Sequence, residues 1–309
     1  MALFSKPTAR ALAILDLLTA NPHESYGLTE ITRKLGLNKA TCHAILTTMA
    51  HYGFLVQDPR SKAYRLGPNI VAAGNAAFAQ FPILEYARPE LEALSQELGL
   101  GCGAAGRSGR HLVLLAHYGH SNPMLSPFQL GMRLPFMAPL GASFIAWSPA
   151  RQLEQWLATG EQRLGAAFDE KLDQKLRISV IAIRARGFEV TLKTAAEDEL
   201  HRGLKQIEGT WNLEELEQIT SRYQASLLSS HYHLDRIDPA TRYAVCNITV
   251  PVFGYDQLPE LIFSTGSIQR DLSGQEILDI ARQLKDAAER ARQAAARAYN
   301  RQHRDLEPR

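Results

Sequence analysis

The chain has 309 residues, 45% of them hydrophobic, and 34 Lys and Arg against 32 Asp and Glu give a formal net charge of +2. This length predicts two domains, and the composition is ordinary for a globular chain. No stretch approaches 18 consecutive apolar residues, so we expect no membrane partner. The three cysteines, Cys42, Cys102 and Cys246, are odd in number and far apart, which favours reduced thiols and a cytoplasmic location.

The first elements predict three helices. The first covers residues 8–20, and its buried side is expected to consist of Leu12, Ile14, Leu15 and Leu18. A short helix over 29–35 ends at Gly36, where a positive φ costs little. Asn38 then occupies an N-cap position, and the core-facing stripe of the helix that follows is Cys42, Ile45, Leu46 and Met49. Two helices joined by so short a turn predict a helix-turn-helix, whose second helix can enter a DNA major groove.

The outer face of that second helix is small and polar. It carries Lys39, Ala40, Thr41, His43, Ala44 and Thr47. Small residues let a backbone approach base edges, and Thr and His can donate hydrogen bonds to bases or phosphates. A solvated helix face is the common alternative, and the segment that follows favours the DNA interpretation.

Residues 54–66 predict a β-hairpin whose turn carries Arg60 and Lys62. Such a hairpin directly after the helix-turn-helix is a wing placed to contact phosphate or the minor groove. Residues 1–67 hold eight basic and four acidic residues, so the positive excess is confined to this end of the chain. We therefore predict a winged helix-turn-helix domain over 1–67 that binds a double-stranded DNA operator through Arg10, Asn38, Lys39, Thr41, His43, Thr47, Arg60, Lys62 and Tyr64.

The remaining chain predicts a linker and a larger second domain. Two helices over 68–98, interrupted at Pro82, form the linker, and Val71, Ala72, Ala76 and Phe78 are expected to pack against a second subunit. Strands are predicted at 111–117, 243–253 and 261–268, and helices at 153–157 and 174–186. A final helix is capped by Ser273, and a tail covers 303–309. This mixture predicts an α+β domain over 99–302.

Several motifs together resemble the isocitrate lyase regulator (IclR) family of bacterial transcription factors. They are RALAIL (10–15), LTEI (28–31), LGLNK (35–39), YRLG (64–67), GMRLP (131–135) and RGF (186–188). The resemblance implies a winged helix-turn-helix, a linker helix and a C-terminal GAF-like effector domain with an antiparallel sheet flanked by helices. It also implies a small-molecule effector, and homodimers or homotetramers on palindromic operators.

Departures from the family pattern shape the expected effector. In place of the family's polar stretch and pocket cysteine, the predicted effector-binding positions are Phe136, Ala138, Leu140, Asn247, Phe263 and Thr265. Losing polar groups favours a larger and more apolar effector, such as an aromatic or alicyclic catabolite. A helical insertion over about 194–242, with a helix at 213–228, is expected either to cap the pocket or to extend an oligomer interface.

Other signals predict neither catalysis nor a cofactor. Gly101–Gly106 spells G-x-G-x-x-G, but a helix precedes it, so a tight turn into a strand is the better interpretation. His201, His231 and His233 are interpreted as solvated histidines in preference to a metal site. The carboxylates show no catalytic spacing. An enzyme with an N-terminal winged-helix docking module is the alternative function, and a winged helix that binds only protein is a third.

Overall fold

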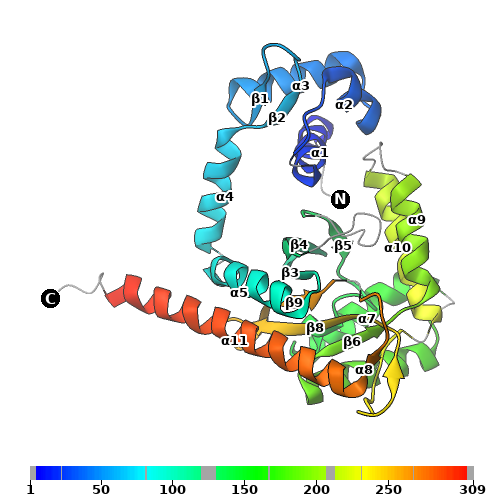
Figure 1. Ribbon diagram of the computed structural model, residues 1–309. Coiled ribbons are helices and arrows are strands. Elements are labelled where there is room, and N and C mark those ends of the chain that lie inside the picture. The colour runs from blue at the N-terminus through cyan, green and yellow to red at the C-terminus, as the bar shows by residue number, and fades with distance from the viewer. Residues whose placement is uncertain are drawn as a thin grey trace. The chain divides into compact units, whose positions relative to one another are not determined.

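The computed structural model describes residues 5–21, 23–80, 82–119, 130–165, 168–206, 213–230, 232–266 and 268–304 (Figure 1). It divides into two compact units. The first comprises Met1–Phe81 with Arg202–Ile219, and the second comprises Pro82–His201 with Thr220–Arg309. In the described part of the chain, no helix combines the length and the apolar character needed to cross a membrane.

The first unit contains the predicted winged helix-turn-helix. Its elements are α1 (Lys6–Ala20), α2 (Leu28–Leu35), α3 (Lys39–His51), β1 (Leu55–Gln57), β2 (Tyr64–Leu66) and α4 (Pro68–Gln80). Gly36 ends α2 at φ 59°, and Asn38 caps α3 by accepting hydrogen bonds from the backbone N–H groups of Ala40 and Thr41. The predicted turn chemistry is therefore confirmed.

The three helices enclose a small apolar core that includes Ile14, Ile31, Cys42 and Leu46, each fully buried. The prediction for α1 needs one correction, because Leu12 is 49% exposed and Leu17 is buried in its place. Ile14, Leu17 and Leu18 sit at the i, i+3, i+4 spacing of one helix face, and Leu12 falls outside it.

The second unit is built on a six-stranded antiparallel sheet in the order β5-β4-β3-β9-β8-β6. Its strands are β3 (Cys102–Ser108), β4 (His111–Tyr118), β5 (Arg133–Pro135), β6 (Glu189–Leu192), β8 (Val245–Phe253) and β9 (Pro259–Thr265). A separate two-stranded ladder joins β7 (Arg242–Tyr243) to β10 (Leu272–Ser273). The α+β class predicted for this domain is confirmed.

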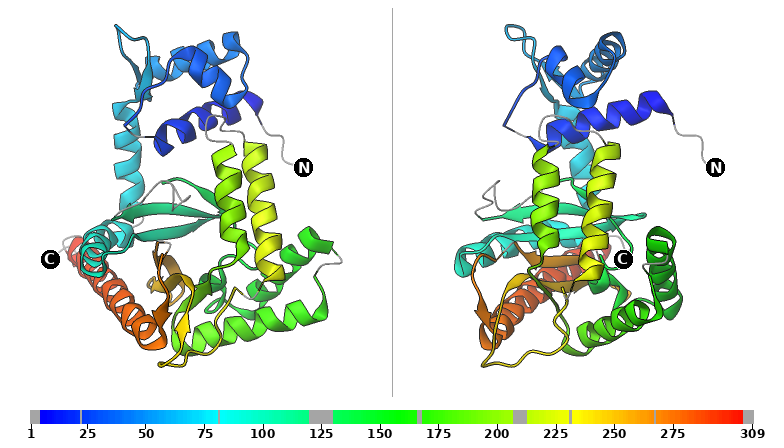
Figure 2. Two further views of the ribbon diagram at one scale, coloured as in Figure 1. Left: turned by 45° about the vertical axis from the view of Figure 1, so that its right-hand side comes forward. Right: turned by 90° about the vertical axis from the view of Figure 1, so that its right-hand side faces the viewer.

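Two long helices, α5 (Pro82–Leu98) and α11 (Gly274–Arg304), pack on each other and on one face of the sheet (Figures 1 and 2). Strand alternation sends Ile248, Val250, Leu261 and Phe263 toward this face, where all four are buried. The half of the predicted linker that follows Pro82 is thus part of the second unit.

The remaining helices lie between β5 and β7 in the chain. They are α6 (Ala142–Ile145), α7 (Ala150–Leu164), α8 (Glu170–Arg186), α9 (Ala195–Gln206) and α10 (Leu213–Ser229). The first three share a buried cluster that includes Trp156, Leu176 and Ile183. The predicted helical insertion contains α9 and α10, which run side by side (Figure 2).

A tight turn into a strand is predicted from the sequence at the G-x-G-x-x-G segment, whereas Gly101 directly precedes strand β3 and the other five residues lie within it. A Cβ at Gly103 would lie 2.9 Å from the carbonyl oxygen of Ala116, and one at Gly106 would lie 2.8 Å from Leu115 Cδ1. These glycines therefore permit close approach of neighbouring strands rather than a turn.

Candidate functional site

The outer face of α3 is open. Lys39, His43 and Thr47 are exposed, and Thr41 is half-buried at the edge of the same face. The opposite face buries Cys42 and Leu46 in the core, and burial raises the pKa of the Cys42 thiol. A helix held by one face and presenting small polar side chains on the other has the form of a recognition helix.

The wing is a tight hairpin that carries its cations outward. Asp58 Oδ1 accepts hydrogen bonds from the backbone N–H groups of Ser61 (2.7 Å) and Arg60 (3.0 Å) and from the Ser61 hydroxyl (2.9 Å). These bonds, with that from the Ser61 backbone the most important, hold the pKa of Asp58 below its usual range. Arg60 and Lys62 are exposed beside this turn, and Lys62 adopts a left-handed φ of 59°.

One of the predicted DNA contacts, Tyr64, lies in the protein interior. Tyr64 is 3% exposed and belongs to the core of the first unit, so the prediction that it contacts DNA is wrong. Strand alternation turns its neighbour Arg65 outward, and Arg65 is exposed. Applying the period of two to β2 would have selected Arg65 from the sequence. Arg10 is half-buried on α1, and the Asn38 side-chain oxygen is occupied in capping α3.

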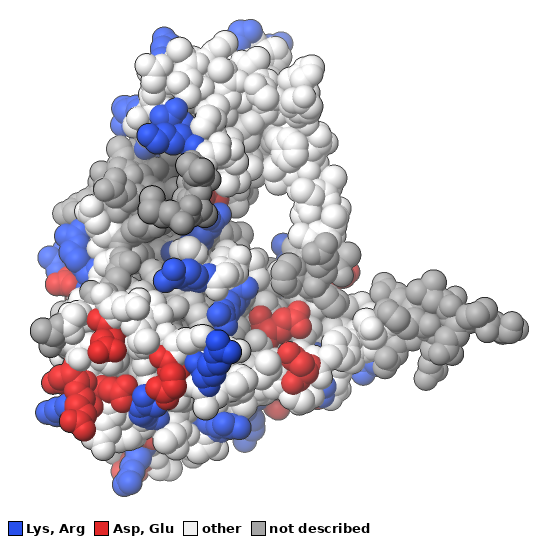
Figure 3. Space-filling view, turned by 180° about the vertical axis from the view of Figure 1, so that it is seen from behind, with Lys and Arg blue, Asp and Glu red and all other residues white. Residues whose placement is uncertain are grey.

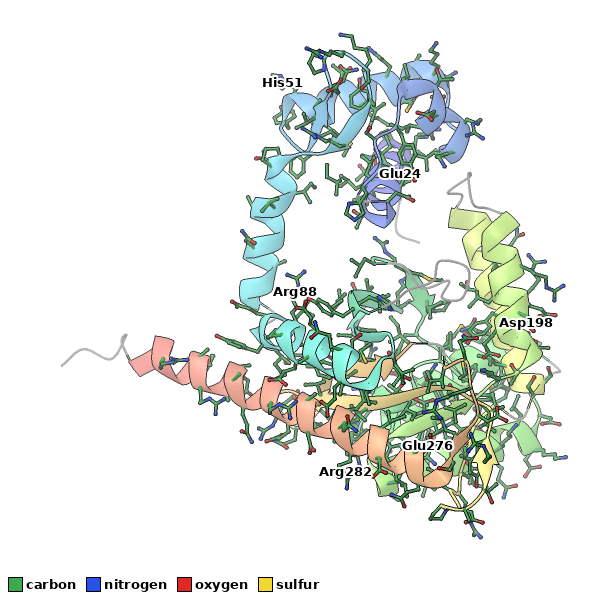
Figure 4. The ribbon with its side chains drawn as sticks, in the orientation of Figure 1. Glu24, His51, Arg88, Asp198, Glu276 and Arg282 are labelled. Carbon is green, nitrogen blue, oxygen red and sulfur yellow. The ribbon has the colours of Figure 1, made fainter. Side chains whose placement is uncertain are left out.

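Figure 3 shows basic side chains over the first unit, with few acidic groups beside them on the visible face. On the second unit the same view shows both signs intermixed. His51, labelled in Figure 4, marks the last turn of α3 and is exposed.

A cavity of about 490 Å³ lies in the second unit, on the face of the sheet opposite α5 and α11. The sheet side of the cavity is lined by small or apolar residues of three strands, including Gly103 and Ala105 of β3, Leu114 of β4 and Ile262 of β9. Strand β8 contributes the polar residues Asn247 and Thr249. Loop and helix residues close it from elsewhere, including Leu140 and Ser143 near α6, Leu200 on α9 and Tyr223 and Leu227 on α10. A cavity of this size can hold a small organic molecule.

Ionisable groups also line the cavity. Glu189, Lys193, Glu197 and Asp198 are the Lys, Arg, Asp and Glu side chains among its described lining residues. Asp198, on α9, is labelled in Figure 4. Burial raises the pKa of the Cys246 thiol to about 12 and lowers the pKa of His117. Both are therefore uncharged at neutral pH.

Three of the six predicted effector-binding residues line this cavity, namely Leu140, Asn247 and Thr265. Phe263 is fully buried on the side of the sheet that faces the helices, because it alternates with the lining residues Ile262 and Ser264. Ala138 is fully buried in the cluster of α6, α7 and α8, and Phe136 packs against the same cluster. These three predictions are wrong for the cavity.

The insertion supplies lining residues that sequence reasoning did not select. Glu197 and Leu200 come from α9, and Tyr223 and Leu227 from α10. Each pair is spaced three or four residues apart on a helix, so the helical periodicity indicated a buried side but not its partner. Glu189 on β6 is a further lining residue that the sequence did not single out.

The histidine interpretation also needs correction. His233 is 1% exposed, so it is not a solvated surface histidine. Its Nδ1 lies 3.2 Å from Asp235 Oδ1. His231 and the side chain of His201 lie outside the described residues. Within the described part, no three His, Cys, Asp or Glu side chains are grouped as metal ligands would be.

The first unit is thus a winged helix-turn-helix, a class of module that binds DNA, and the second unit holds a cavity of the size that takes a small molecule. The IclR helix-turn-helix domain model matches residues 7–59. The HTH-type transcriptional regulator XynR of Escherichia coli (strain K12) is 31% identical over 149 residues, which cover 48% of this chain and 59% of XynR. The winged unit is therefore similar to the helix-turn-helix domain of IclR-family transcriptional regulators.

Solved structures share the fold. An IclR transcriptional regulator from Alicyclobacillus acidocaldarius aligns with a TM-score of 0.60 at 18% identity, covering 95% of this chain and all of that one. An IclR homologue from Microbacterium hydrocarbonoxydans, complexed with 4-hydroxybenzoate, aligns with a TM-score of 0.59 at 16% identity, with coverages of 95% and 100%. In sequence, the chain spans 51–64% of the length of four curated relatives.

Proposed function

We propose that this protein is a DNA-binding transcriptional regulator that senses a small molecule through its second unit. The observation that carries the proposal is the exposed polar face of α3 beside a cationic wing, on a domain that matches the IclR helix-turn-helix model. XynR, which is similar over 149 residues of this chain, is named a transcriptional regulator, which supports regulation over an enzymatic role.

In this proposal, the residues of the first unit divide into two roles. Lys39, Thr41, His43 and Thr47 on α3 contact base edges or adjacent phosphates. Arg60 and Lys62 on the wing hold the DNA backbone, and Arg65 joins them in place of Tyr64. Arg10 contributes from α1 as a phosphate contact, and Asn38 presents the first turn of α3 through its capping bond.

The effector we propose is an aromatic or alicyclic catabolite. The cavity is large enough for a single ring with substituents, and much of its wall is apolar, including Leu112, Leu114, Leu134 and Ile262. The structural neighbour complexed with 4-hydroxybenzoate supports the same class of ligand.

We further propose that the protein is cytoplasmic and binds palindromic operators as a homodimer or homotetramer. On α4, Val71 is 63% exposed and Ala72 and Ala76 are exposed, which supports their packing against a second subunit. The side chain of Phe78 lies outside the described residues. The effector acts by binding one arrangement of the protein more tightly, which typically changes DNA affinity by about 1–3 kcal/mol.

Selection of bound duplexes from fragments of the gene's own genomic neighbourhood tests the proposal. We expect the full-length chain to enrich one site of twofold symmetry, with half-sites about 34 Å or a multiple apart. The Thr41→Ala and His43→Ala variants should change which site is preferred. If the chain binds no duplex in a salt-sensitive manner, the proposal fails and a protein-docking winged helix replaces it.

A further inference from the structure

One residue that lines the cavity, Glu189, carries a buried carboxylate, and burying a charged group costs free energy. Glu189 is the first residue of β6, is 8% exposed and lines the cavity. It pairs with Thr249 of β8, which lines the same cavity. A buried carboxylate needs a donor or a cation to offset its desolvation, so its partners decide what it is for.

Among the described residues, a hydrogen bond reaches one oxygen of this carboxylate. The Ser143 hydroxyl donates to Glu189 Oε2 at 2.5 Å. The other oxygen, Oε1, lies 3.8 Å from His233 Nε2, which is beyond hydrogen-bonding distance. His233 is 1% exposed, and its Nε2 has no hydrogen-bond partner in the described part of the chain. Glu189 Oε1 and His233 Nε2 therefore lie near each other without forming a hydrogen bond.

The nearby cation is the half-buried Arg186, whose Nη2 has no hydrogen-bond partner in the described part of the chain. The Arg186 guanidinium donates to the backbone oxygen of Phe188 at 2.6 Å and to that of Leu234. Burial lowers the pKa of Arg186, and the carboxylates of Glu189 and Asp235 act against that effect. Arg186 is thus attracted to both carboxylates, while the hydrogen bonds of its guanidinium go to backbone oxygens.

The rest of the lining adds negative charge. Besides Glu189 it carries Glu197 and Asp198 against the single cation Lys193, within the described residues. Glu197 Oε2 accepts hydrogen bonds from the backbone N–H of Thr194 at 2.8 Å and from the Thr194 hydroxyl at 2.7 Å. A cavity with this balance repels an anionic ligand and attracts a cationic one.

We propose that Glu189 is the ligand-recognising group of this cavity, and that the ligand presents to it a protonated amine carried on an apolar body. This inference rests on the proposed function, because it names the chemistry of the effector that the cavity takes. The ammonium group binds Glu189 Oε1, while Ser143 positions the carboxylate by donating a hydrogen bond to Oε2. The ring or aliphatic body lies against the leucines of β4.

Matched probes test the charge preference on the full chain. Benzylamine, benzyl alcohol and benzoate share one ring and differ in charge, as do cyclohexylmethylamine, cyclohexylmethanol and cyclohexanecarboxylate. In isothermal titration calorimetry at neutral pH, we expect each amine to bind about tenfold or more tightly than its matched carboxylate. Equal or tighter binding of the carboxylates overturns the proposal, and so does a failure of both amines to bind at millimolar concentration.

Substitution of the carboxylate tests its assignment. Glu189→Gln keeps the shape and an acceptor for Ser143, and should weaken amine binding about tenfold or more while leaving the alcohols within about twofold. Glu260→Gln is the matched control, because Glu260 is a half-buried residue of β9 that does not line the cavity. Unchanged amine affinity in Glu189→Gln contradicts the assignment.

A second variant covers the case in which Glu189→Gln does not fold. Lys193→Met removes the cation of the lining and keeps Glu189, so amines should bind about threefold or more tightly and carboxylates more weakly. The reverse order, or no change for either class, overturns the proposal. If the protein binds duplex DNA but prefers carboxylates, the amine proposal fails and the proposed function stands. If it binds amines but no duplex DNA, the proposed function fails and the amine proposal stands.

Discussion

The α3 face with its wing and the cavity of the second unit both use charged side chains, but they place those charges in opposite environments. Arg60 and Lys62 stand in solvent on a turn that Asp58 organises. Glu189 is buried and Arg186 half-buried, and the two side chains attract each other. The first arrangement acts over distance and is screened by salt, whereas the second acts at short range.

The contrast explains how much each region tolerates change. An exposed cation can be removed at little cost to folding, because water replaces its interactions. A buried charge cannot be removed alone, because its neighbours are left without compensation. Four predictions test this difference, from the largest expected effect to the smallest.

Removal of the half-buried cation Arg186 should have the largest effect. Arg186→Ala removes the guanidinium donor from the carbonyl oxygens of Phe188 and Leu234, and it removes the attraction of that cation for Glu189 and Asp235. We expect the free energy of unfolding to fall by about 3 kcal/mol or more, measured by urea denaturation. Arg236→Ala, at an exposed site, should change it by less than about 0.5 kcal/mol. Similar losses of unfolding free energy in Arg186→Ala and Arg236→Ala would contradict the difference expected between enclosed and exposed charges.

Removal of the wing cations should change DNA binding and leave folding alone. The double variant Arg60→Ala with Lys62→Ala should weaken binding on all duplexes and flatten the slope of log affinity against log salt by up to about one unit for each phosphate that is no longer neutralised. Fluorescence anisotropy titrations at several salt concentrations measure this. A control with Arg151→Ala and Arg236→Ala removes two exposed arginines of the second unit and should leave the slope unchanged.

Loss of the helix cap of α3 should have an intermediate effect. Asn38→Ala removes the acceptor for the backbone N–H groups of Ala40 and Thr41 and should cost about 1 kcal/mol of stability. Asn38→Ser, which retains a capping oxygen, should cost much less. Thermal unfolding followed by circular dichroism measures both variants, and an equal loss in the two would show that capping is not the role of Asn38.

An exposed carboxylate in the second unit should behave like the charges of the first. Glu276, labelled in Figure 4 near the start of α11, accepts from the Ser273 backbone at 2.8 Å and from Arg270 at 2.5 Å, and these bonds lower its pKa to about 2. Because the folded-state pKa is depressed, its stabilisation is present above the ordinary value near 4.5 and is lost as the pH falls toward 2. Glu276→Gln should therefore cost about 0.5 kcal/mol or less at pH 7 and nothing near pH 2. A difference that does not depend on pH would contradict this account.

The first unit was largely predictable because its signals are local. Gly36 and Asn38 mark the turn and the cap within three residues of each other, and the buried stripe of α3 follows from one helical period. The error at Tyr64 came from choosing a wing residue by its position in the chain, although the period of two in β2 sends it inward.

The cavity was less predictable because its groups come together from distant parts of the chain. Ser143, Glu189 and His233 are separated by more than forty residues at each step and meet through the sheet and the segment that bridges Thr191. Phe263 shows the complementary failure, since choosing between the two faces of β9 requires knowledge of where α5 and α11 lie.

The shortage of side-chain atoms along β3 governs what the protein can accommodate. Gly103 and Ala105 are the two residues of β3 that line the cavity. Because neither has a large side chain, the cavity is deeper at this strand. One or two methyl groups added at Ala105 would reduce the cavity volume available to a ligand. Over evolutionary time, a change of one or two carbons on this strand is therefore a simple way to retune which guest fits, without altering the groups that hold it.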